Sequence, residues 1–96
     1  MMPLAYVREG SLVRISAIRA GKGLYRRLHE LGIIEGKVLR VVKAQGPGPV
    51  IIEIINNASY VNGGVPRFHY YLATGGRLVL GFGVAMKIMV EEVGTP

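Results

Sequence analysis

The 96-residue chain contains no cysteine, no aspartate and no tryptophan. Without cysteine, disulfides, thiolate metal sites and cysteine nucleophiles are excluded. Its apolar runs stop well short of the roughly 20 residues that a membrane-spanning helix needs, because charged residues such as Glu53 and Lys87 interrupt them. The segment Met1–Leu4 lacks the charged leader and apolar core of a secretory signal. We therefore expect a cytoplasmic protein that does not insert into a membrane.

What the chain does have is a surplus of positive charge. Twelve lysines and arginines stand against six glutamates, which gives a net charge of +6. Such an excess favours nucleic acid, an anionic membrane surface or an acidic protein as partner. The basic residues are spread along the chain, and only Lys22–Arg27 is locally dense. A generally solvated basic surface is the first interpretation, and a dedicated anion-binding site is the alternative.

Alternating apolar and polar residues predict strands along most of the chain. Residues 11–18 show the pattern most clearly, with Val13, Ile15 and Ala17 on one face. In the segment 37–43 the facing is ambiguous, because two sets of aliphatic residues compete for the core. Frequent Gly and Pro turns separate the strands. The predicted strands cover residues 11–18, 37–43, 50–55, 77–80 and 88–93.

One short helix is predicted over residues 23–31. Leu24, Leu28 and Leu31 follow one another at i, i+4 and i+7, so we expect all three in the core. Gly32 is placed to end this helix in a left-handed conformation. A one-turn helix is expected near 84–87. About five short strands with these helices predict a mainly β, single domain over residues 3–93, built as a small barrel.

Residues 56–76 do not continue the regular alternation of predicted strands and short turns. They hold four of the seven aromatic residues and two Gly-Gly turns, which suggests a hairpin insertion. The aromatic side chains are expected to pack this hairpin onto the barrel. The alternative is a stacking platform for nucleic acid, because small basic barrels combine aromatic and basic side chains in this way. The residues of that platform would be Tyr60, Arg67, Phe68, Tyr70 and Tyr71.

Reactive groups are too few to predict an enzyme. No serine or threonine lies in a nucleophile elbow, and only His29 and His69 could act as bases near neutral pH. His29 and Glu30 are neighbours on the predicted helix, so their side chains point about 100° apart and do not chelate one ion. His29 and His69 therefore stand only as weak candidates for a divalent transition metal such as Fe(II), and no cofactor is firmly implied.

The order of several motifs resembles the FeoA family, the small cytosolic proteins of ferrous iron uptake, whose module also forms an SH3-like domain in some iron-dependent repressors. The chain has an "EG" turn at 9–10, Gly-x-Gly at 21–23 and "RRLxELGxxxG" over 26–36. The later strands and the Pro-rich turn at 46–49 also fit, and the resemblance covers about 75 residues. The insertion at 56–76 departs from the family, whose members pass this point through a short link.

The resemblance implies an SH3-like barrel that is a non-enzymatic adaptor or regulator of the FeoB membrane transporter, acting through its cytosolic region. A nucleic-acid-binding barrel is the first alternative. The second is a metal-responsive domain in which iron promotes self-association through His29 or His69, so a homo-oligomer is also left open. For an adaptor, the helix surface and the insertion supply the candidate partner-binding residues, namely Lys22, Tyr25, Arg26, Arg27, His29, Arg67, Phe68, Tyr70 and Tyr71.

Overall fold

The strands form one antiparallel sheet in a computed structural model that describes residues 1–44, 46–55 and 77–94. In the sheet the strands lie side by side in the order β1-β6-β2-β3-β4-β5. All five predicted strands are confirmed, and β1 is an additional strand that is too short to show an alternating pattern. The bounds are β1 Met2–Pro3, β2 Leu12–Ile18, β3 Val38–Ala44, β4 Val50–Ile54, β5 Arg77–Leu80 and β6 Ile88–Gly94.

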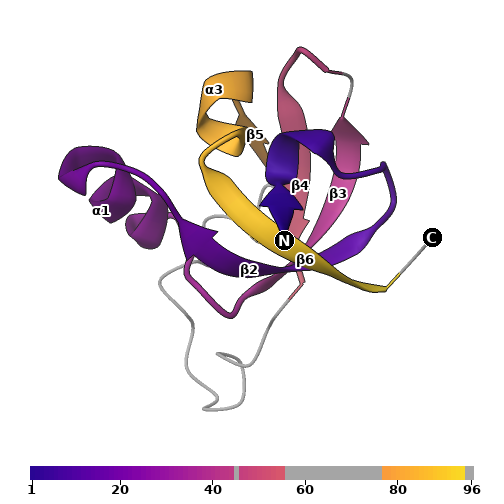
Figure 1. The fold of residues 1–96 in the computed structure, drawn as a ribbon, viewed down its shortest axis with the longest axis horizontal. Coiled ribbons are helices and arrows are strands. Elements are labelled where there is room, and N and C mark those ends of the chain that lie inside the picture. The colour runs from indigo at the N-terminus through magenta and orange to yellow at the C-terminus, as the bar shows by residue number, and fades with distance from the viewer. Residues whose placement is uncertain (45, 56–76, 95–96) are drawn as a thin grey trace.

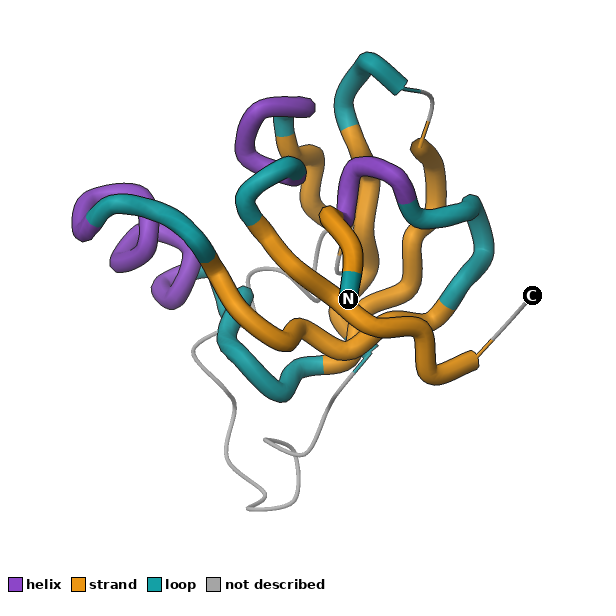
Figure 2. Tube along the Cα trace, viewed as in Figure 1, coloured by secondary structure: helices purple, strands orange, loops and turns teal. Residues whose placement is uncertain are grey.

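The sheet curls into a small barrel (Figures 1 and 2). Register shifts between Leu12 and Val13 and between Ile15 and Ala17 interrupt the pairing of β2 with β6, and another shift interrupts the pairing of β3 with β4. Irregularities of this kind bend a strand and increase its twist, so they allow a short sheet to curve around its own core. The mainly β, barrel-like architecture predicted from the sequence is thereby confirmed.

The core lies inside this curled sheet. In β3 it is Leu39 and Val41 that are fully buried, whereas Val38 and Val42 are only half-buried. The pairing register explains the choice, because Leu39 stands opposite Val13, another fully buried residue. Side chains of directly opposed residues lie on the same face of a sheet. The cross-strand pairing thus settles the facing that the pattern of residues 37–43 left ambiguous.

The helix α1 (Lys22–Glu30) is confirmed, but its three leucines are not equally buried. Leu28 is 2% exposed and belongs to the core, and Leu24 is half-buried against it. The prediction that Leu31 is a core residue is wrong, because Leu31 is half-buried and lies outside the core cluster. Leu31 is the C-cap residue, where the chain already leaves the helix, and Ile33 enters the core instead.

The short helix α3 (Phe82–Ala85) begins two residues earlier than predicted. The carbonyl groups of Gly81 and Phe82 accept hydrogen bonds from the N–H groups of Ala85 and Met86. A 3-10 turn, η1 (Leu4–Tyr6), lies beside α3 at one end of the barrel, whereas α1 stands out from its side (Figure 1).

Candidate functional site

The helix α1 carries all the predicted binding residues that the structure describes. Gly21 precedes the helix without a side-chain cap, and the chain leaves it through Gly32, whose φ is +90°. The N–H groups of Gly32 and Ile33 donate to the carbonyl groups of His29 and Leu28, at 3.0 and 2.9 Å. This pair of bonds is a Schellman motif, which satisfies the last carbonyl groups of the helix. The helix therefore ends abruptly, and the following turn folds back beside it.

The exposed side of α1 is mainly basic, with Glu30 as its one exposed acidic residue. Lys22, Arg26 and Arg27 are all exposed. The ion pairs found among the described residues use Arg14, Arg40, Arg77 and His29, so none of them involves these three cations. Cations without an ion-pair partner among the described residues are available to carboxylates or phosphates of another molecule.

Tyr25 and His29, one turn apart on α1, meet Glu35 from the following turn. The Tyr25 hydroxyl donates a hydrogen bond to Glu35 Oε2 at 2.9 Å, and His29 Nε2 lies 3.3 Å from Glu35 Oε1. The two rings also contact each other, with centroids 4.3 Å apart and planes tilted by 36°. One carboxylate thus holds both rings, and each of its oxygens has a different partner.

The surroundings of Glu35 lower the pKa of its carboxyl group from the ordinary value of 4.5. The largest cause is a hydrogen bond with its own backbone, and the hydrogen bonds from Tyr25 and His29 and the charge of His29 act in the same direction, against burial. The hydrogen bond to Glu35 raises the pKa of the Tyr25 hydroxyl, with burial and the Glu35 charge adding to it. Both shifts favour an ionised Glu35 beside a neutral Tyr25 at neutral pH.

Replacing Glu35 with glutamine (E35Q) should therefore lower stability in a pH-dependent way. A lowered pKa in the folded state contributes stability above the unfolded-state value, and this contribution is lost as the pH falls through the folded-state pKa. The difference in free energy of unfolding between wild type and E35Q should be largest at neutral pH and shrink in acid. Urea denaturation from neutral pH to about pH 3 measures it. A difference that grew in acid would contradict this assignment.

Glu35 was not among the predicted site residues, because on the helix only Glu30 is a direct neighbour of His29. Two signals were available: Tyr25 and His29 are spaced i, i+4 on one helix face, and Gly36, with φ of +93°, marks a tight turn next to Glu35. The remaining predicted residues, Arg67, Phe68, His69, Tyr70 and Tyr71, lie outside the described residues. Within residues 1–44, 46–55 and 77–94, no three histidine or acidic side chains are close enough to hold a metal ion together.

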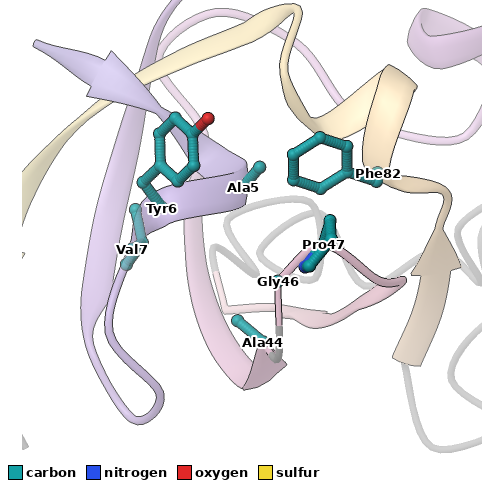
Figure 3. Close-up of a pocket in the computed structure, with 7 residues that line it drawn as sticks. All are labelled: Ala5, Tyr6, Val7, Ala44, Gly46, Pro47 and Phe82. Atoms are coloured by element: carbon teal, nitrogen blue, oxygen red, sulfur yellow. The ribbon is translucent and has the colours of Figure 1, made fainter.

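A second candidate is an open hollow of ≈ 510 Å³ between η1, the β3–β4 turn and α3 (Figure 3). Tyr6 and Phe82 face each other across it edge to face, with ring centroids 6.3 Å apart. Pro47 lies below Phe82, and among the lining residues only Tyr6 carries an ionisable group. The hollow can accept an apolar side chain but offers no acid–base pair. No pattern in the sequence predicts this hollow, because Tyr6 and Phe82 are far apart in the chain.

Comparisons with known proteins point to one family. The family model described as the FeoA domain matches residues 2–92. The chain is 37% identical over 92 residues, covering 96% of it and 88% of the relative, to a protein of Methanocaldococcus jannaschii named "Putative Fe(2+) transport protein A". None of the helices in the described part of the chain is long and apolar enough to cross a membrane.

Solved structures share the fold. The crystal structure of an iron uptake regulatory protein, FeoA, has a TM-score of 0.69 at 22% identity, covering 96% of this chain and 97% of that one. Stenotrophomonas maltophilia FeoA, solved in complex with zinc and described as an SH3 domain protein, has a TM-score of 0.63 at 21% identity, covering 95% and 91%. At these identities the likeness shows the fold alone.

Proposed function

The chain belongs to the FeoA family, which is implicated in ferrous iron transport, and on this premise we propose that it is a non-enzymatic, cytoplasmic regulator of a FeoB-type iron transporter. It acts by protein–protein contact with the cytosolic region of that transporter. The family membership supports the place in iron uptake. The contact itself is inferred from the surface of α1.

The observation that carries the proposal is the basic side of α1. Lys22, Arg26 and Arg27 are exposed on a helix that stands out from the barrel (Figure 1). The described ion pairs leave these cations unused. With a net charge of +6, the protein is attracted to an acidic surface, and complementary charge increases both the association rate and the specificity of such a contact. We therefore assign the transporter-facing surface to α1.

Reversing the charges of Arg26 and Arg27 (R26E/R27E) should weaken binding to the isolated cytosolic region of the transporter by about tenfold or more. Like charges brought together at an interface cost several kcal/mol, and a tenfold loss of affinity corresponds to about 1.4 kcal/mol. Biolayer interferometry with the purified partners measures the affinity. The wild-type affinity should also fall as salt is added, because salt screens exposed charges.

The matched control is K43E/K87E, which changes the net charge by the same amount at exposed positions outside α1. It should retain most of the affinity, with only the general electrostatic attraction reduced. Circular dichroism checks that both double variants are folded, since a reversed charge in the last turn also opposes the helix dipole. Equal losses of affinity in the two variants, or no loss in R26E/R27E, would contradict the assignment to α1.

A further inference from the structure

The strand β5 lies at an edge of the sheet. Among the described strands it pairs only with β4, on one of its two sides. The N–H and carbonyl groups along the other side of an edge strand can accept a further strand, and proteins often protect such an edge with proline or by keeping it short. The opposite edge, β1, has two residues and includes Pro3, whereas β5 has four residues and no proline. Of these two edges, β5 therefore suits the addition of a strand.

The outer face of the sheet carries an exposed apolar side chain at this edge. Val79 of β5 is 67% exposed and stands opposite Ile51 of β4, which is half-buried and stands opposite Lys43 of β3. These three residues, with Gly48 and Pro49, line an open hollow of ≈ 350 Å³. Directly opposed side chains on one face of a sheet contact each other. An added strand can therefore place an apolar side chain against Val79, beside this hollow.

The next row of side chains on the same face is charged. Glu53 of β4 stands opposite both Arg40 of β3 and Arg77 of β5, and its carboxylate oxygens lie 3.9 Å from the guanidinium group of each arginine. One carboxylate thus faces two guanidinium groups, so the row keeps a surplus of positive charge. The Arg77 side chain is 58% exposed at the edge. An acidic residue of an added strand would complement this charge, and cross-strand pairs of opposite charge are stabilising.

We propose that the edge of β5 binds an extended segment of a partner protein by strand addition, with an apolar side chain beside Val79 and an acidic one beside Arg77. The two residues are two positions apart on one face, so their neighbours in the added strand are also two apart. All described strand pairs are antiparallel, and in an antiparallel partner the residue beside Val79 comes first. The recognised pattern therefore reads apolar-x-acidic. In this mode the main chain supplies affinity and alternate side chains supply specificity.

A second copy of the chain does not fit the same pattern. The strand β5 reads Arg-Leu-Val-Leu and has no acidic residue to place beside Arg77. Each copy also has a net charge of +6, so two copies repel each other. Charge complementarity thus favours a different protein with an acidic segment. This contact uses no residue of α1, so it goes beyond the contact proposed for the transporter.

A synthetic peptide tests the recognition directly. Acetyl-Thr-Phe-Thr-Glu-Thr-amide has the apolar-x-acidic pattern, and its addition to the full-length protein should shift the backbone NMR signals of β5 and β4 most. The reversed peptide, Thr-Glu-Thr-Phe-Thr, has the same composition and should bind about threefold or more weakly, because its side chains no longer match both positions. Replacing the glutamate of the peptide by lysine should weaken binding by about fivefold or more.

Methylation of the peptide nitrogens tests the main-chain pairing. In an antiparallel strand the N–H groups of alternate residues face opposite neighbours. One peptide is N-methylated at phenylalanine and glutamate, and a second is N-methylated at the central threonine. One of the two should lose binding, because its methyl groups face β5, and the other should keep it. Equal effects of the two would contradict strand addition.

Variants with matched controls test the two side chains. R77E should weaken binding of the peptide by about tenfold or more, because it brings like charges together. R14E changes the charge equally at another exposed strand arginine, which lies 3.7 Å from Glu91, and should leave binding unchanged. V79T keeps the branched shape and the β propensity of valine but should weaken binding by about threefold. V93T makes the same change at an exposed valine of β6 and should have no effect.

Unchanged binding in folded R77E and V79T, or signal shifts centred away from β5, would overturn the proposal. Equal binding of the glutamate and lysine peptides would overturn the acidic character of the partner segment. Sedimentation velocity of the peptide-free protein should show a monomer. A dimer that V79T or R77E disrupts would overturn the proposed occupant and assign the edge to a second copy. None of these measurements includes the transporter, so their failure would not bear on the contact through α1.

Discussion

Replacing Leu28 by alanine (L28A) is expected to lower the free energy of unfolding by about 2–5 kcal/mol, the usual cost of a leucine truncated in a packed core. Leu28 is 2% exposed and is the one buried residue of α1. Alanine has the highest helix propensity, so the helix itself is not weakened by the change. The loss therefore reports the packing of α1 against the barrel. Chemical denaturation followed by circular dichroism measures it.

Two further variants make the result specific to burial. L28M keeps the volume and should cost less than about 1.5 kcal/mol. L31A removes the same atoms from the leucine at the C-cap of α1, which lies outside the core cluster, and it should cost less than about 1 kcal/mol. A larger loss in L31A than in L28A would show that α1 is held to the barrel by Leu31, contrary to the burial seen here.

Replacing Gly32 by alanine (G32A) is expected to destabilise the protein by about 1–2 kcal/mol, the cost of a left-handed backbone for a residue with a Cβ. The φ of Gly32 is +90°, and an added Cβ would meet the nearest atom, Ile54 Cδ1, at 3.4 Å. Since this is a light contact, the cost comes mainly from the backbone. Thermal or urea unfolding measures the difference between the wild type and G32A.

A glycine-to-alanine substitution near the start of the helix should have the opposite effect on the free energy of unfolding. Gly23 lies within α1, has no left-handed φ, and an added Cβ there would meet nothing within 4 Å. G23A should therefore stabilise the protein by about 0.4–1 kcal/mol by restricting the unfolded chain. Stabilisation by G32A, or equal effects of G32A and G23A, would contradict the role of Gly32 as the residue that ends the helix.

Short-range patterns predicted most of the fold. The alternation of Val13 and Ile15 identified a strand and its buried face, and both residues are in the core. Glycine positions predicted where α1 ends, because a left-handed residue at that point is encoded locally. The prediction failed where the pattern did not contain the deciding contact. Leu31 fits the helical stripe, yet the chain turns away at that residue and Ile33 is buried in its place.

Only some residues of the candidate site could be predicted from the sequence. Its basic residues are clustered along the chain, so Lys22, Arg26 and Arg27 could be identified together and are indeed exposed. Glu35 could not be paired with His29 by helical spacing, because the two are separated by the turn that ends the helix. The hollow between Tyr6 and Phe82 joins the first and last parts of the chain, which no local pattern relates.

The sequence by itself determined the class of fold, the family and the basic character of the α1 surface. These properties depend on composition, on alternation and on glycine positions, all of which are set within a few neighbouring residues. The tertiary structure alone decided which face of β3 is buried, which leucine anchors α1, and that one carboxylate reaches both Tyr25 and His29. The reason is that such contacts depend on strand register and on the path of the chain between elements.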